Sequence, residues 1–265
     1  MHNLVFCINA GHDRLPGISA HPRPAALARL RLDLPRADGA TPVTHQVLPD
    51  NCIDILCQDQ QDASFAVGMM TAPIAVASLG LVQTVAARFK PGAAARFFQL
   101  PLCELSDGRT GLQQLWGRDL AARLGDALWS EPLSNAQRVS ILQEYLLLRL
   151  RNAPPRRQAG AADHAIAAIE RACGQVRVEG LAAQLGVSRQ HLAQQFRQHV
   201  GISPKLFARI CRFRAASAGM QNLAGQQDWA QVALQYGYFD QSHLIHDFQD
   251  FARSSPEAWL TGRRA

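Results

Sequence analysis

The chain has 265 residues, of which 48% are hydrophobic and 18% are charged, and its formal net charge is +6. These totals are ordinary for a globular protein of one or two domains. No apolar run approaches the ~18 residues that a membrane-spanning helix needs, which excludes a membrane partner. The N-terminus lacks a basic stretch followed by a long apolar one, so we expect no signal peptide and a cytoplasmic location.

The first part of the chain has the pattern of an α+β domain. Residues 1–40 are rich in Pro, Gly and Arg and lack periodicity, so we expect loops and short extended pieces there. Short segments rich in β-branched residues then alternate with turn signals. This pattern predicts strands over 43–48, 52–57, 64–70, 73–80 and 81–89.

Helices follow this small β-rich layer. A turn and a short helix are expected over 90–98, and helical spacing of apolar residues predicts amphipathic helices over 118–129 and 134–151. The second of these carries an apolar stripe, which either packs on its own sheet or forms the surface of a dimer (Val139, Leu142, Leu146 and Leu150). We therefore expect an α+β sensor or dimerisation domain over 1–151.

A linker and an all-α domain complete the organisation. The segment RNAPPRRQAG (151–160) holds two prolines, a glycine and three arginines and has nothing to bury, so we place a linker at 152–161. Everything after it has a helical pattern. The second domain therefore spans 162–265.

This second domain contains an internal repeat. At an offset of 51 residues one hexapeptide matches another, and at an offset of 52 two further pairs match (LAAQLG 181–186 with VALQYG 232–237; HLAQQF 191–196 with HLIHDF 243–248; SPKLF 203–207 with SPEAW 255–259). The single-residue change in offset falls in a turn, where an insertion costs least. An ordered repeat of this kind implies two copies of one supersecondary unit.

Each copy has the pattern of a helix-turn-helix. In the first, Leu181 and Leu185 line one face of a helix that Gly186 ends, Ser188 caps the next helix, and Leu192 begins its apolar face. In the second copy Asp240 is the cap, with Leu244 and Phe248 packing behind it. A long helix over 205–223 joins the two units. A helical bundle that uses the repeat only for packing does not explain why both second helices keep polar faces.

The polar face of the first unit has chemistry suited to DNA. Its exposed positions offer Arg for guanine, Gln for adenine and further polar groups (Arg189, Gln190, His191, Gln194 and Arg197). The Ser-Pro pair at 203–204 opens the next helix with free backbone N–H groups, which favour phosphate binding. Ser203 and Lys205 belong to this predicted phosphate site. Residues 188–214 carry six basic residues and no acid, which predicts one local basic surface (Arg189, Arg197, Lys205, Arg209, Arg212 and Arg214).

With these motifs, residues 163–260 resemble the paired helix-turn-helix domain of the AraC/XylS family of bacterial transcription regulators. The stretches SRQHLAQQFRQHVGISPKLF (188–207) and VALQYGYFDQSHLIHDFQDFARSSPEAW (232–259) carry the resemblance. It implies contacts to double-stranded DNA from both second helices (Ser188, Arg189, Gln190 and Gln194 in the first unit; Gln241, Ser242, His243 and His246 in the second). It also implies RNA polymerase as a partner if the protein is an activator.

The second unit departs from the family pattern. From 228 to 251 there are four acids and no Lys or Arg (Asp228, Asp240, Asp247 and Asp250). His243 and His246 stand where family members usually carry basic residues. Because histidines titrate near neutral pH, we expect this unit to bind DNA weakly, or to read bases without a strong phosphate anchor, and to bind more tightly as the pH falls toward 6.

The first domain resembles a β-rich domain that precedes such units in uncharacterised family members, over 48–58, 67–73 and 85–117. This position suits a sensor of an unknown small-molecule effector, or a dimerisation module that gives a homodimer. No phosphate loop, nucleophile elbow or HExxH pair is present, so we expect neither an enzyme nor a cofactor.

A cysteine- or metal-responsive sensor is the alternative. Its candidate residues are His45, Cys52 and Cys57, joined by Cys103, which converge if 43–47 and 53–57 pair as a hairpin. Against it, six scattered cysteines without a CxxC pair are mostly small buried hydrophobes (Cys7, Cys52, Cys57, Cys103, Cys173 and Cys211). An alkyl-transferring repair regulator is excluded, because its Pro-Cys-His-Arg motif is absent.

Overall fold

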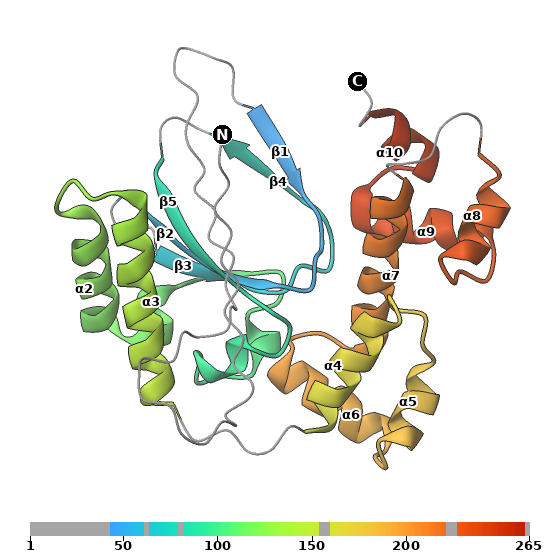
Figure 1. The fold of residues 1–265 in the computed structure, drawn as a ribbon, viewed down its shortest axis with the longest axis horizontal. Coiled ribbons are helices and arrows are strands. Elements are labelled where there is room, and N and C mark those ends of the chain that lie inside the picture. Colours follow the sequence, from blue (N-terminus) through green and yellow to red (C-terminus); the bar gives the residue numbers. More distant parts are fainter. Residues whose placement is uncertain (1–42, 61–63, 79–81, 154–159, 221–226, 263–265) are drawn as a thin grey trace, which may run out of the picture.

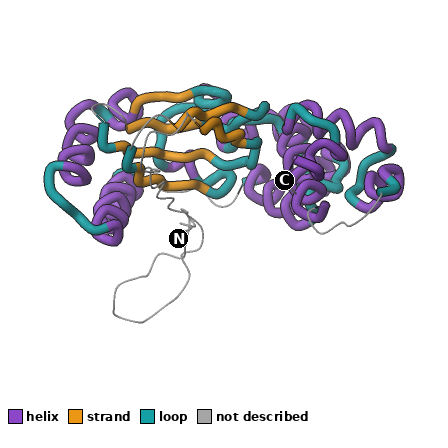
Figure 2. Tube along the Cα trace, turned by 90° about the horizontal axis from the view of Figure 1, so that it is seen from above, coloured by secondary structure: helices purple, strands orange, loops and turns teal. Residues whose placement is uncertain are grey.

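The computed structural model describes residues 43–60, 64–78, 82–153, 160–220 and 227–262 (Figure 1). A β-rich region with its own helices lies at one end and a purely helical region at the other (Figure 2). This arrangement confirms the fold class expected from the sequence. Within the described ranges no helix is long and apolar enough to cross a membrane. The pattern predicted for 1–40 lies outside the described residues.

The main sheet has four antiparallel strands in the order β5-β2-β3-β6: β2 (Ile53–Gln58), β3 (Ser64–Val67), β5 (Thr84–Phe89) and β6 (Arg109–Gly111). Strict alternation in β2 buries Ile53, Ile55 and Cys57 on one face. The remaining strands, β1 (Val43–Val47) and β4 (Ile74–Ser78), form a separate antiparallel pair. The hairpin of 43–47 with 53–57, on which the cysteine site depended, is therefore wrong, because β1 pairs with β4 and β2 pairs with β3 and β5.

Five helical segments accompany this sheet, and two of them, α1 and α3, contact its strands: η1 (Ala94–Arg96), η2 (Leu102–Glu104), α1 (Leu112–Trp116), α2 (Arg118–Trp129) and α3 (Asn135–Arg151). Ser134 and Gln137 form a capping box that fixes the start of α3. Val139, Leu142 and Leu146 are buried in the core of this domain. The apolar stripe of α3 was expected either to pack on its own sheet or to form a dimer surface. The structure shows it packed within its own domain.

The C-terminal region consists of α4 (Ala161–Arg171), α5 (Val178–Gln184), α6 (Arg189–His199), α7 (Pro204–Met220), α8 (Trp229–Gln235), α9 (Gln241–Ala252) and α10 (Pro256–Gly262). The long helix α7 runs through its middle, with α5 and α6 at one end and α8 and α9 at the other (Figure 1). Part of the expected linker, 154–159, lies outside the described residues.

The two copies of the sequence repeat form the same hydrogen bond at their turns. Gly186 and Gly237 end α5 and α8 with φ of +66° and +74°. In the next position the N–H of Val187 donates to Ala182 O at 3.1 Å, and the N–H of Tyr238 donates to Ala233 O at 3.0 Å. Both turns thus reverse the chain in the same way. The two units are true copies of a helix-turn-helix.

Hydrogen bonds of the loop before β2 join the β-rich region to the long helix α7, among them one from Asn51 Nδ2 to Cys211 Sγ at 3.3 Å. The Asn51 amide is buried and donates to Phe207 O at 3.1 Å. The Arg214 guanidinium donates to Asp50 O at 2.9 Å. The loop before β2 therefore holds α7 across about two of its turns.

Two more contacts reach the individual units. Ser106, which follows η2, donates from Oγ to Gly201 O at 2.8 Å, directly after α6. Gln46 of β1 donates from Nε2 to Ala252 O at 3.0 Å, at the end of α9. The β-rich region consequently contacts both helix-turn-helix units as well as the helix that joins them.

The turn glycines give a direct test of this fold. Gly186→Ala should lower the free energy of unfolding by about 1 kcal/mol, because a Cβ is disfavoured at positive φ, although no atom lies within 4 Å to obstruct it. Gly180→Ala is the matched control: Gly180 lies inside α5 with open space around it, so alanine should raise the free energy of unfolding by about 0.5 kcal/mol. Urea denaturation followed by circular dichroism measures both. Equal effects of the two changes would contradict the turn geometry.

Candidate nucleic-acid interface

The first recognition surface is the exposed face of α6. Ser188 caps this helix, with its Oγ accepting the N–H of His191 at 3.1 Å. Leu192 and Phe196 are fully buried on the opposite face. The residues predicted to face DNA are all exposed (Ser188, Arg189, Gln190, His191, Gln194 and Arg197). The helix therefore presents guanidinium and amide groups, which can pair with base edges, on a single side.

The start of α7 adjoins this surface. Ser203 is half-buried and caps α7, with its Oγ accepting the N–H of Leu206 at 3.2 Å. Pro204 occupies the first helical position, and the Lys205 side chain is exposed. The second unit repeats the arrangement, where Ser255 accepts the N–H of Ala258 at 3.1 Å before α10. Helix starts of this kind favour anions.

The six basic residues of 188–214 do not form one surface, so that prediction is wrong. Arg209 pairs with acids on α9, and the Arg212 guanidinium carbon lies 5.1 Å from the centre of the Tyr238 ring. Arg214 bonds the loop before β2. These three arginines lie on α7 and contact neighbouring elements. Arg189, Arg197 and Lys205 remain as exposed cations near the recognition face, and Arg189 lies 3.3 Å from Glu179 in an exposed pair.

The second recognition surface is the exposed face of α9. Asp240 caps this helix and accepts the N–H of His243 at 2.8 Å, and its Oδ1 also lies 3.0 Å from His243 Nδ1. These bonds hold the pKa of Asp240 below its usual range. The residues predicted to face DNA here are all exposed (Gln241, Ser242, His243 and His246).

All four acids of the second unit have structural roles. Asp228 caps α8, accepting the N–H groups of Ala230 and Gln231 at 3.0 and 3.2 Å, and Asp240 caps α9. The other two, Asp247 and Asp250, pair with Arg209 as described next. The acids that set this unit apart from the family pattern are thus helix caps and ion-pair partners, whose charge is partly compensated within the protein.

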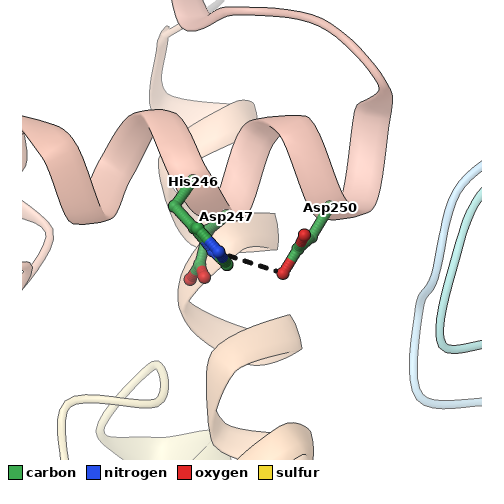
Figure 3. A group of neighbouring side chains, drawn as sticks. All are labelled: His246, Asp247 and Asp250. Carbon is green, nitrogen blue, oxygen red and sulfur yellow. Dashed lines mark ion pairs between the residues drawn. The ribbon is translucent and has the colours of Figure 1, made fainter.

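Arg209 on α7 binds both remaining acids through one nitrogen. Its Nη2 lies 2.6 Å from Asp247 Oδ1, 2.6 Å from Asp250 Oδ2 and 3.4 Å from His246 Nδ1. Figure 3 shows the three side chains of α9 converging, with His246 and Asp250 joined by an ion pair of 3.3 Å. Asp247 is only 5% exposed, so its charge needs this partner. The cluster fastens the second unit to α7.

His246, Asp247 and Asp250 are residues of the types that bind metal ions. Among the described residues they form a group whose potential ligand atoms lie within 4.8 Å of one another. The guanidinium nitrogen of Arg209 lies within hydrogen-bonding or ion-pair distance of every member. A cation supplied by the protein already occupies the position that a metal ion would take. The geometry is that of an ion-pair network.

The residues of the cysteine-sensor alternative are not brought together as expected. His45 lies in β1 opposite Val76, whereas Cys57 lies in β2 of the other sheet and Cys52 directly precedes that strand. Burial raises the pKa of Cys52 and of Cys57 to about 12. Thiolates, which bind metals and react with oxidants, are therefore disfavoured at both positions. Cys103 is exposed on η2.

The Arg209 cluster predicts a stability effect. Arg209→Gln should lower the free energy of unfolding by about 2 kcal/mol, because Asp247 stays buried without its charged partner. Chemical denaturation with a tryptophan fluorescence readout measures the change. Arg189→Gln is the control, because both members of its ion pair are more than 60% exposed; it should leave stability nearly unchanged. An Arg209 variant as stable as the wild type would show that the network contributes nothing.

Known proteins resemble the two regions separately. Residues 181–262 match a family model described as a helix-turn-helix domain, and residues 31–110 match one described as a domain of unknown function (DUF6597). An uncharacterized HTH-type transcriptional regulator of Haemophilus influenzae is 30% identical over 82 residues. That alignment covers 31% of this chain and 27% of the relative.

This chain carries an AraC-type helix-turn-helix domain. The resemblance seen in its sequence is confirmed, for the N-terminal region as well as the C-terminal one. Solved structures of ToxT from Vibrio cholerae show a distant likeness. One is 10% identical with a TM-score of 0.45, covering 83% of this chain and 97% of ToxT. Another, of ToxT bound to (E)-4-(8-methylnaphthalen-1-yl)but-3-enoic acid, is 11% identical with a TM-score of 0.45 and covers 83% and 98%.

Within the AraC-type domain, sequence reasoning missed the partners of the α7 arginines. Asp247 and Asp250 lie 38 and 41 residues from Arg209. A charge count along the chain does not show which of these distant residues pair. The lack of basic residues in the second unit, together with an excess on the connecting helix, was the available clue.

Proposed function

We propose that this protein is a sequence-specific, DNA-binding bacterial transcription regulator whose two helix-turn-helix units both contact double-stranded DNA. One observation carries the proposal. The two units share the hydrogen bond that reverses the chain after the turn glycine, a side-chain cap at the start of the second helix and an exposed polar face on that helix, and one continuous helix, α7, joins them. Two such units on one arm suit successive major grooves on one side of a duplex, roughly 34 Å apart.

In the first unit we assign base recognition to the face of α6. Arg189 suits guanine, and Gln190 and Gln194 suit adenine, because each can form two hydrogen bonds to the base edge. Arg197, Lys205 and the capped start of α7 supply phosphate contacts, which fix the register of the protein on DNA. Ser188 and His191 complete the contact set.

In the second unit Gln241, Ser242, His243 and His246 make the contacts. This surface has no Lys or Arg of its own, so the first unit supplies most of the electrostatic attraction. The second unit then adds sequence recognition. This unit therefore binds DNA more weakly than the first one.

The N-terminal domain is proposed to regulate this binding, through an unknown small-molecule effector or through a homodimer. Support comes from its contacts with α7 and with both units, since a change in this domain reaches both recognition helices. A shallow pocket of about 460 Å³ also lies between the two regions, lined by residues of β1 and of the α9–α10 junction, Gln46 and Trp259 among them. A protein of this kind acts in the cytoplasm, and as an activator it also contacts RNA polymerase.

The test is a selection of bound sequences from random duplex DNA with the purified full-length protein. We expect an enriched motif with two boxes whose centres lie about one helical turn, ~10 base pairs, apart. A single box would restrict DNA reading to one unit. Binding that shows no enrichment and disappears steadily with added salt would contradict sequence-specific recognition.

A matched pair of variants assigns the boxes. Gln190→Ala with Gln194→Ala should relax the preference in one box by about 1–3 kcal/mol per lost base contact and leave the other box unchanged. Gln198→Ala is the control, because Gln198 is exposed on the same helix but was not assigned a base contact. An unchanged motif in the double variant would show that α6 does not read bases.

The second unit predicts a dependence of DNA binding on pH. Each histidine lies beside an acid, His243 beside Asp240 and His246 beside Asp250, and Arg209 also faces His246. A protonated imidazole carries a positive charge and donates from both nitrogens. We therefore expect affinity for the selected duplex to rise about three- to tenfold from pH 8 to pH 6 at fixed salt.

Fluorescence anisotropy titrations measure this effect. The gain should be lost in the variant with His243→Gln and His246→Gln and kept in His164→Gln, a change on α4. An affinity that stays flat between pH 6 and pH 8 in the wild type would remove the role assigned to the two histidines.

A further inference from the structure

Phe239 is the most exposed large hydrophobic residue among those that the structure describes. Its exposed fraction is 83%, whereas the aromatic residue before it, Tyr238, is 3% exposed. Single exposed apolar side chains are common on protein surfaces. The position of this one is what calls for an explanation.

Phe239 is the extra residue of the second turn. The first unit passes from Gly186 through Val187 to the cap Ser188, whereas the second passes from Gly237 through Tyr238 and Phe239 to the cap Asp240. Tyr238 makes the hydrogen bond that Val187 makes in the first unit, and its side chain is buried, whereas that of Val187 is partly buried. Phe239 therefore has no counterpart in the first unit and no packing role in the second.

The ring lies beside the proposed DNA-binding surface. Phe239 directly precedes the cap of α9, and its ring centre is 6.0 Å from that of His243 in an edge-to-face arrangement at 86°. The His243 side chain is itself 65% exposed. In a helix-turn-helix the N-terminal end of the second helix approaches the base edges. An aromatic ring placed there extends that surface with an apolar group.

We propose that Phe239 contacts the C5-methyl group of a thymine in the box read by the second unit. This inference rests on the proposed function and names the base that the unit prefers. The thymine methyl is the apolar group exposed in the major groove, and Phe is among the residues that contact it. Because 228–251 contains no Lys or Arg, an apolar contact gives this unit sequence preference without a cationic anchor.

Duplex DNA is favoured over a protein partner because the ring is continuous with the polar face of α9. It contacts His243, and the cap and first turn of that helix follow it directly. Leu234 is the other strongly exposed apolar residue of this unit, with an exposed fraction of 66%, and it lies on α8, the first helix of the unit, not beside the cap of α9. Leu234 thus provides a matched control.

The experiment replaces the thymines of the second box one at a time by deoxyuridine, which differs only in lacking the methyl group. At one position the wild type should lose about fourfold in affinity, the value expected for one buried methyl. Phe239→Ala should lose a similar factor on the thymine duplex and no longer distinguish thymine from deoxyuridine there. Leu234→Ala should keep the wild-type discrimination. Circular dichroism shows that both variants are folded.

Each outcome decides between defined alternatives. A bipartite motif in which Phe239→Ala still discriminates thymine from deoxyuridine would overturn the inference and leave the proposed function intact. Normal DNA binding with loss of transcriptional activation in Phe239→Ala would also overturn it and assign the ring to a protein contact. A single-box motif for the wild type would overturn both the two-unit function and this inference.

Discussion

The spacing between the two helix-turn-helix units depends on a single helix. α7 has 17 residues and so spans about 25 Å. Near one end Phe207 packs against Phe196 of the first unit, with ring centres 5.7 Å apart. Farther along, Phe213 packs against Phe248 and Phe251 of the second unit at 5.0 and 5.4 Å. Because both units bury their aromatic cores on one rigid element, the separation of their recognition helices is set by the fold.

The ion-pair network of Arg209 adds orientation to this spacing. Aromatic packing alone tolerates some rotation of α9 about the long helix, whereas two hydrogen-bonded carboxylates at fixed distances do not. The acids that make the second unit differ from its family pattern therefore help to aim its recognition helix. The cost is a weaker positive potential on that unit, and in the proposed function the exposed histidines and Phe239 supply other means of contacting DNA.

The N-terminal domain contacts α7 at the places where such an orientation can be altered. The loop of Asp50 and Asn51 bonds two turns of the helix, and Asp50 and Asp54 share the Arg88 side chain of β5. Asn51 adopts φ of +59° while its amide is buried in the interface. Strands, interface loop and long helix thus form one connected set of polar contacts. In the proposed regulation, these contacts transmit a change in the sheet to α7, which joins the two recognition helices.

Much of this architecture follows from local sequence. The Gly-Val-Ser and Gly-Tyr-Phe-Asp turns, the Ser-Pro helix starts and the repeated apolar spacing place every helix from 178 to 262 close to where the structure has it. The three-residue strand β6 (Arg109–Gly111) was missed, but the other five described strands were predicted within a few residues, because β-branched runs and turn residues are local signals. Their pairing was not: which strand lies beside β1 depends on tertiary packing. The long-range partners of Asn51, Arg209 and Arg214 were invisible for the same reason.

The proposed function requires both recognition helices to occupy DNA at once from one side of the duplex. Hydroxyl-radical footprinting of the full-length protein on its selected duplex measures this arrangement. We expect two protected patches on the same face of the helix, about one turn apart, with the patch of the second unit weakened in Arg209→Gln. A single patch, or two patches on opposite faces, would contradict it.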